Sequence, residues 1–192
     1  MFSNASKATD LPEITRMRHR VLWRVGSLLT LLVLVLTLAL SRTGILTLNP
    51  NGTFGTTLII ASVAALLKLL SDRTTYLPFL GDCVLPSTVL YARTPDKASV
   101  IINVKVPAGA THVMYWASES GAGIVPNPFD AYGNYANAGV VEATADGMAT
   151  LKIRCPSQYT VRGRTMPRHV HYRAVYKSGI AGPVETVNVV CL

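Results

Sequence analysis

The chain opens with two apolar stretches separated by a turn signal. The first, 25–41, is dominated by leucine and valine, and the second, 57–67, is again apolar. From the start of one to the end of the other, the only charged residue is Arg42. An Asn-Pro-Asn-Gly sequence begins at Asn49, and such Pro- and Gly-containing pairs mark turns. The pattern predicts an α-helical transmembrane hairpin.

The second stretch is the shorter one. A membrane-spanning helix needs about 20 apolar residues. The first stretch reaches this length if Arg24 extends its guanidinium to the headgroups. The second includes Lys68 near its end, so two interpretations stay open: two spans, or one span followed by an amphipathic helix in the interface. Because no small-residue cleavage site follows Ser41, we expect a retained anchor rather than a signal peptide.

The formal net charge is +8, and it is unevenly distributed. The flank of the first stretch carries basic residues at Lys7, Arg16, Arg18, Arg20 and Arg24. Since basic residues favour the cytosolic side, two spans would leave both ends of this integral membrane protein on that side. If the second stretch does not span, the C-terminal domain lies on the opposite side.

The three cysteines, Cys83, Cys155 and Cys191, match neither a zinc pattern nor a CxxC motif. We expect free thiols in a reducing compartment. One disulfide with one remaining thiol is the alternative.

From Leu77 onward, apolar and polar residues alternate with a period of two in short runs. Alternation of this kind, with Gly, Pro and Asp between runs, predicts an all-β C-terminal antiparallel sandwich of about seven strands. The runs are Ser87–Arg93, Val100–Val106, Thr111–Ala117, Gly139–Ala145, Ala149–Arg154, His169–Tyr176 and Val184–Val190. Asp146-Gly147 indicates a tight hairpin. The long loop 118–138, rich in Tyr, Asn and Gly, suits a packed contact loop.

The expected organisation therefore has four parts. They are a basic N-terminal flank at 1–24, the transmembrane hairpin at 25–71, a linker at 72–85 and the β-sandwich domain at 86–192.

One cluster could carry chemistry. His169 and His171 lie two residues apart on a predicted strand, so both imidazoles face the same way. Tyr159 precedes them, and two imidazoles with a phenolate form a plausible site for Fe³⁺. Three interpretations remain open: a polar sheet face without metal, which we expect, a metal site without activity, and an active enzyme.

A series of short motifs occurs in order between residues 112 and 176. They are Trp116-Ala117, Asn127-Pro128-Phe129, Ala145-Asp146-Gly147, Leu-Lys-Ile-Arg-Cys-Pro at 151–156, Tyr159, Gly163-Arg164 and Pro-Arg-His-Val-His-Tyr at 167–172. Together they resemble the β-sandwich core of the intradiol ring-cleavage dioxygenases. Those enzymes hold iron with two tyrosines and an HxH pair. The resemblance implies Tyr159, His169 and His171 as ligands of Fe³⁺.

Two positions depart from that family's pattern. The family's first tyrosine ligand follows the Trp-containing strand, where this chain has 123–125, Gly-Ile-Val, with Tyr132 and Tyr135 coming later. Met166 stands where the family has an arginine three residues before the first histidine, and Arg168 is displaced. We therefore expect a shared scaffold with a lost or altered site.

The segment 152–177 carries seven basic residues and no acidic one. These are Lys152, Arg154, Arg162, Arg164, Arg168, Arg173 and Lys177. Together with the basic N-terminal flank, they are candidates to bind the lipid bilayer or an acidic partner protein. A solvated sheet face is the alternative. We do not expect nucleic acid as a partner, because no stacking aromatic residues form a recognisable motif.

The overall layout is similar to small membrane-anchored structural proteins of large icosahedral DNA viruses. That resemblance implies a minor capsid or inner-membrane protein that links a virion's internal membrane to capsid proteins. We expect a non-catalytic structural or interaction protein that presents a β-sandwich at a membrane surface. The alternative function is a membrane-tethered, non-haem iron enzyme of the intradiol dioxygenase type.

Overall fold

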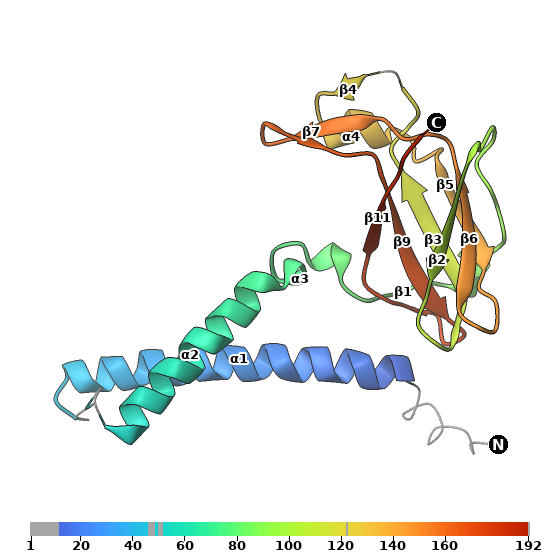
Figure 1. Ribbon diagram of the computed structural model, residues 1–192. Coiled ribbons are helices and arrows are strands. Elements are labelled where there is room, and N and C mark those ends of the chain that lie inside the picture. The colour runs from blue at the N-terminus through green and yellow to red at the C-terminus, as the bar shows by residue number, and fades with distance from the viewer. Residues whose placement is uncertain (1–11, 46–48, 50–51, 122, 192) are drawn as a thin grey trace, which may run out of the picture. The chain divides into compact units, whose positions relative to one another are not determined.

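The computed structural model describes residues 12–45, 49, 52–121 and 123–191. Lys7 and part of the predicted 49–52 turn lie outside the described residues. The chain divides into two compact units, 1–80 and 81–192. The first is helical and the second is mostly antiparallel β-structure (Figure 1).

The first unit is a pair of packed helices, α1 (Pro12–Arg42) and α2 (Thr53–Ser71). One face of α2 is buried, and its residues recur at helical spacing: Gly55, Leu58, Ser62 and Ala65. Three of the four are small, and small side chains let two helix backbones approach closely.

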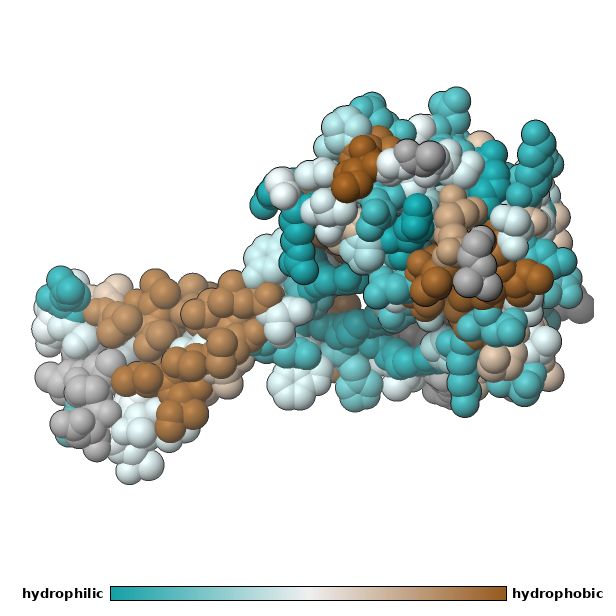
Figure 2. Space-filling model, turned by 45° about the horizontal axis from the view of Figure 1, so that its top comes forward, coloured by the Kyte–Doolittle hydropathy of each residue, from teal (hydrophilic) through white to brown (hydrophobic). Residues whose placement is uncertain are grey.

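The outer faces of the two helices are apolar and exposed. Leu29, Val35 and Ile60 are 55%, 60% and 64% exposed, and Figure 2 shows hydrophobic side chains over much of this unit. Monomeric soluble proteins rarely expose so large an apolar surface. Both helices are long and apolar enough to cross a membrane. At 1.5 Å per residue, the 19 residues of α2 extend about 28 Å, close to the thickness of a bilayer's hydrocarbon core.

A polar network closes the end of α2. Asp72 caps α3 (Arg73–Tyr76) by accepting a hydrogen bond from the Thr74 amide at 2.9 Å. Arg24 on α1 forms an ion pair with Asp72 at 3.1 Å and also donates to the Thr74 hydroxyl. The Thr74 hydroxyl bond, followed by the Thr74 amide and Arg24, holds the pKa of Asp72 below its usual value despite partial burial. A single-turn 3₁₀ helix, Pro78–Leu80, follows.

The second unit contains eleven described strands and one short α-helix. Their bounds are β1 Cys83–Val84, β2 Val100–Lys105, β3 Ala110–Ala117, β4 Ile124–Val125, α4 Pro128–Tyr132, β5 Ala138–Glu142, β6 Met148–Ile153, β7 Gln158–Val161, β8 Arg164–Met166, β9 His169–Tyr176, β10 Ile180–Ala181 and β11 Glu185–Asn188.

The strands form three sheets. The largest has the order β1-β10-β9-β3-β5, and β11 also pairs with β9. β2 pairs with β6, and β4, β7 and β8 form a third sheet in which the β4–β7 pair is parallel. Figure 1 shows β4, β7 and α4 together at one end of this unit.

The main core lies between the largest sheet and the β2–β6 pair. Val113, Tyr115 and Val170 pack there with Leu151 and Ile153, and all five are fully buried. The predicted alternation in β2 and β6 is confirmed, because Val100, Ile102 and Val104 lie on the inner side and the residues between them are exposed. The layered arrangement confirms the predicted fold class, an apolar helix pair followed by an antiparallel β-domain.

The prediction of a strand at Ser87–Arg93 is wrong. Ser87–Val89 is a 3₁₀ helix, and only Arg93 makes an isolated bridge, with Val140. Pro86 stands at the N-cap of that helix and has no amide proton to give to a ladder. The turn at Asp146-Gly147 is present, with the Gly147 amide donating to Thr144. The strands on either side of it, however, belong to different sheets.

The cysteine prediction also needs correction. Cys155 and Cys191 form a disulfide with their Cα atoms 5.9 Å apart, and Cys83 is a free thiol. The alternative interpretation, one bond with one remaining thiol, is therefore confirmed. The two partners are 36 residues apart, so their spacing alone carried no pairing signal.

Candidate metal centre

Four side chains bring their donor atoms together beside the third sheet. The hydroxyl of Tyr159 lies 3.0 Å from Nε2 of His169 and 3.1 Å from the hydroxyl of Tyr132. The Tyr132 hydroxyl is 3.3 Å from His169 Nε2, which in turn is 3.2 Å from Nε2 of His171. Both tyrosines and His169 are buried, while His171 is half-buried.

The two histidines owe their common direction to β9, as the i, i+2 spacing predicted. β9 lies between β3 on one side and β10 and β11 on the other, which fixes its position in the sheet. Tyr159 comes from β7, whose partner β8 leads directly toward β9. The structure therefore brings Tyr159, His169 and His171 together, as the sequence predicted.

Tyr132 is the member that the sequence did not assign. It is the last residue of α4, which begins at a well-formed cap: the Asn127 side chain accepts from the Asp130 amide at 2.9 Å, and Pro128 opens the helix. Gly133, with a φ of +46°, ends it. The helix turns the chain so that Tyr132 points inward. In the sequence, the Asn-Pro-x-Asp segment at 127–130 is the signal that could have predicted the start of this helix.

The short helix is tied to the strand that carries Tyr159. The Glu119 amide donates to the Ala131 carbonyl at 2.7 Å, and the Glu119 carbonyl accepts from the Ser157 amide at 3.0 Å. The Ser118 hydroxyl also donates to the Ser157 carbonyl. Ser118 and Glu119, which follow β3, therefore connect the helix that carries Tyr132 with the segment that leads to Tyr159.

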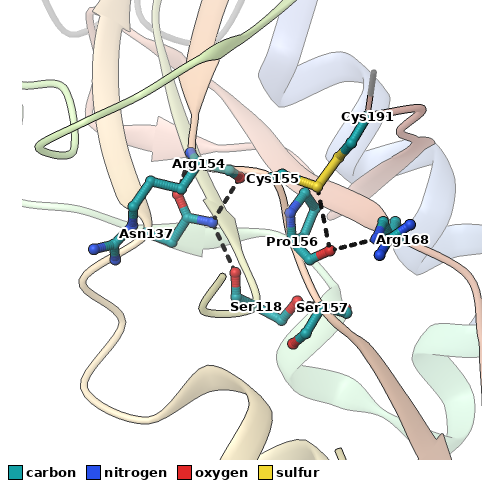
Figure 3. The surroundings of a disulfide bond; sticks show 8 residues. All are labelled: Ser118, Asn137, Arg154, Cys155, Pro156, Ser157, Arg168 and Cys191. Atoms are coloured by element: carbon teal, nitrogen blue, oxygen red, sulfur yellow. Dashed lines mark hydrogen bonds between the residues drawn. A yellow bond between two sulfur atoms is a disulfide. The ribbon is translucent and has the colours of Figure 1, made fainter. Parts of the chain in front are cut away.

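A second network surrounds the disulfide (Figure 3). Asn137, fully buried, bonds the Ser118 carbonyl and both main-chain polar groups of Arg154. Arg168 donates from Nε to the Pro156 carbonyl at 2.9 Å, next to Cys155. These contacts hold the segment that leads from β6 into β7, and thus they position Tyr159.

The outward-facing nitrogens of both histidines have partners. Nδ1 of His169 is 2.5 Å from the Pro167 carbonyl, and Nδ1 of His171 is 2.9 Å from the Thr186 hydroxyl. A carbonyl oxygen only accepts, so Nδ1 of His169 carries the ring proton. In the neutral tautomer that this bond selects, Nε2 carries a lone pair, and it faces the two tyrosine hydroxyls.

Burial raises the pKa of Tyr132 far above its usual value, and the Tyr159 hydroxyl adds to the effect. Burial also raises the pKa of Tyr159. Both phenols are therefore protonated in the absence of a cation. A cation bound here would replace those protons, as metal ions do at other deprotonated ligands.

The chemistry of the four donors fits a ferric ion. Phenolate oxygens are hard ligands and imidazole nitrogens are borderline, a mixture suited to Fe³⁺. Among the described residues there is no group of three or more His, Cys, Asp or Glu side chains that could hold a metal. The cluster differs from such groups because half of its donors are tyrosines.

Hydrophobic side chains pack against the tyrosines of the cluster. They are Trp116, Val125, Val161 and Met166. One of them, Met166, stands three residues before His169, the position that the resemblance noted above assigns to an arginine. Arg168 does not replace it, because its Nε is bonded to the Pro156 carbonyl.

Several predicted basic-surface residues have structural partners. Arg154 forms an ion pair with Glu119 at 2.5 Å. Arg173 is only 8% exposed and donates to the carbonyls of Gly81 and Gly182. Arg173 therefore belongs to the interior, which corrects its placement on a basic face.

Other basic residues are exposed. Arg162 and Arg164 lie at the β7–β8 turn, and Lys152 and Lys177 are also exposed. On α1, Arg18 and Arg20 are exposed and Arg16 is half-buried, while Arg24 pairs with Asp72.

No protein-family model matches this chain, and no curated protein sequence matches it.

Proposed function

We propose that this chain is a membrane-anchored, non-haem ferric protein of the intradiol ring-cleavage type. The observation that carries the proposal is the convergence of Tyr132, Tyr159, His169 and His171. Their donor atoms form a chain of contacts of 3.0–3.3 Å in a largely buried position. Two tyrosines and an HxH pair form the ligand set that the sequence resemblance implies, and Tyr132 supplies its missing member.

Each side chain has a defined part in the proposed site. The tyrosines would contribute two anionic oxygens after losing their protons, and the histidines would contribute neutral nitrogens through Nε2. Such a set leaves one positive charge on a ferric ion, which bound in this way would supply an electrophilic centre for the two hydroxyl groups of a catechol. The protein's own work is to hold the donors in place and to keep bulk water away.

The hydrophobic neighbours of the tyrosines suggest the kind of substrate. Trp116, Val125 and Met166 pack against the tyrosine pair and carry no charge. A flat aromatic ring with two adjacent hydroxyls would offer an apolar surface to such side chains and two oxygens to the donor cluster. We therefore propose a catechol as the substrate class.

The helix pair would hold this site at a bilayer. Insertion of α1 and α2 would cover the leucine, valine and isoleucine side chains that are otherwise exposed. A site kept at a membrane surface has access to catechols that dissolve in lipid.

The first experiment measures iron and visible absorption of the full chain in detergent after loading with Fe³⁺. We expect about one iron per chain and a phenolate-to-iron charge-transfer band. Y132F and Y159F should each shift the band, and H169A should abolish stoichiometric binding. Y172F is the matched control, because Tyr172 lies on β9 and packs into the main core instead. A colourless, iron-free wild type would overturn the proposal.

Turnover is tested separately by oxygen uptake with catechols. Consumption of O₂ that depends on both Tyr132 and Tyr159 would support the enzyme.

A structural or interaction role is the second candidate. Two observations favour it. Met166 stands where the resemblance implies an arginine, and Arg162 and Arg164 are exposed at the β7–β8 turn. An iron-loaded chain that consumes no oxygen with any catechol would favour this role. R162E/R164E should then weaken capture of an acidic partner without lowering the unfolding midpoint.

A further inference from the structure

The second unit has a hollow of about 350 Å³ outside the donor cluster. Two short segments line it, one before β2 and one that leads from α4 into β5: Arg93, Thr94, Pro95, Asp96, Asn134, Tyr135, Ala136 and Ala138. Its volume is in the range of small-molecule sites. We propose that this hollow is a second binding site and that its ligand is a free α-amino acid with an aromatic side chain.

Main-chain contacts hold the two lining segments together. The Arg93 amide donates to the Val140 carbonyl and the Val140 amide donates to the Arg93 carbonyl, both at 2.9 Å. Gly139 permits this close approach, because a Cβ atom there would lie 2.6 Å from the Arg93 carbonyl oxygen. The position of Arg93 beside the start of β5 is therefore fixed by the backbone.

Tyr135 supplies an aromatic ring to the hollow. Its φ of +55° lies in the left-handed region, which is unfavourable for a bulky residue. The Tyr135 amide donates to the Tyr132 carbonyl at 2.8 Å, and the Ala136 amide donates to the Glu119 carboxylate at 2.9 Å. The ring stacks on that of Tyr132 at 5.6 Å between centroids and is still 57% exposed. The fold therefore holds an aromatic ring at the hollow, where the ring of a ligand can pack on it.

Two opposite charges line the same hollow. Neither Arg93 nor Asp96 takes part in the ion pairs found among the described residues. The Arg93 guanidinium lies over the Tyr91 ring, 5.4 Å from its centroid, and donates to the Tyr91 hydroxyl at 3.3 Å. A guanidinium has five N–H donors, so Arg93 can also bind a carboxylate.

This set of groups favours a zwitterion over a simple ion. A ligand with a single charge would be attracted by one of Arg93 and Asp96 and repelled by the other. An α-amino acid has a carboxylate for Arg93, an ammonium group for Asp96 and, when its side chain is aromatic, a ring for Tyr135. Each of the three lining groups therefore has a partner on one small molecule. The inference goes beyond the proposed function, since none of the three is a donor of the metal centre.

The test is a ligand-observed NMR titration of the full chain in detergent, without iron. Three probes are compared: L-phenylalanine, its amide, which lacks the carboxylate, and 3-phenylpropanoate, which lacks the ammonium group. We expect wild type to bind L-phenylalanine about 2–5-fold more tightly than either analogue, the range for exposed charge pairs.

Variants assign each group of the ligand to its partner. R93Q should abolish the preference for L-phenylalanine over its amide and keep the preference over 3-phenylpropanoate, and D96N should do the reverse. Y135L should weaken all three probes, whereas Y135F keeps the ring and should not. K97Q is the matched control, because Lys97 is an exposed neighbour of Asp96 that does not line the hollow.

The outcomes are independent of the iron experiment. A wild type that binds L-phenylalanine no more tightly than both analogues, or not at all, overturns the proposal. R93Q and D96N variants that weaken every probe equally also overturn it, because the loss would then come from a changed hollow rather than from the charges. A chain that fails to load iron defeats the proposed function and leaves these affinities unchanged.

Discussion

Asn137 offers the sharpest test of how the site is held together. The side chain is fully buried, and its amide nitrogen donates to the carbonyls of Ser118 and Arg154 at 2.7 and 3.1 Å. Its oxygen accepts from the Arg154 amide at 2.8 Å. N137A leaves three main-chain polar groups without these partners inside the protein.

The magnitude follows from those three groups. A buried polar group that loses its partner costs about 1–3 kcal/mol. Two of the three groups belong to Arg154 and can relax together. We therefore expect the free energy of unfolding to fall by about 3–5 kcal/mol rather than by the full sum. A domain of this size has about 5–15 kcal/mol in total. The variant should therefore unfold at a much lower denaturant concentration.

The assay is equilibrium urea unfolding of the full chain in detergent, followed by near-ultraviolet circular dichroism. The matched control is N103A, because Asn103 is exposed on β2 and its side chain accepts only from the Thr150 hydroxyl among the bonds described. That control should change the free energy of unfolding by less than about 0.5 kcal/mol. An N137A loss below about 1 kcal/mol would refute the reasoning that water cannot replace these three bonds.

Three further outcomes are expected in the same unfolding assay. Replacing Cys155 and Cys191 together by serine opens a loop of 36 residues and should cost about 4 kcal/mol in the chain-entropy model. L151A removes a fully buried core side chain and should cost about 3 kcal/mol. The Thr74 hydroxyl lowers the pKa of Asp72, so the carboxylate's stabilisation is complete above about pH 4 and is lost as the pH falls through the lowered value. Any difference between wild type and D72N at neutral pH should therefore shrink as the pH falls below the usual carboxyl value of about 3.9.

The sequence predicted most accurately the elements in which a single physical effect sets the residue pattern. In Val100–Lys105 and Met148–Ile153, alternating burial alone sets which residues face the core, so the period of two was sufficient. The same geometry predicted the common direction of His169 and His171. Local stereochemistry thus accounts for the sheet faces and for half of the donor cluster.

The remaining features depend on chain folding over longer distances. Ser87–Arg93 has strand-like composition, yet it forms a 3₁₀ turn at Ser87–Val89 and a single bridge from Arg93 to Val140. Tyr132 reaches the cluster through a five-residue helix whose position depends on main-chain contacts with Glu119. Neither alternation nor spacing encodes those contacts.

The disulfide has a consequence for the compartment in which the domain matures. Cytosolic glutathione and thioredoxin keep thiols reduced, so a Cys155–Cys191 bond persists only where the surroundings are oxidising. The basic N-terminal flank favours the cytosol. Both preferences can hold together only in the topology in which α1 crosses the bilayer and α2 does not, one of the two interpretations that the sequence leaves open; two crossings would leave the domain on the side of the flank. Cys83, the free thiol, then becomes a natural reporter: a membrane-impermeant maleimide that labels it in intact cells would locate the domain outside the cytosol.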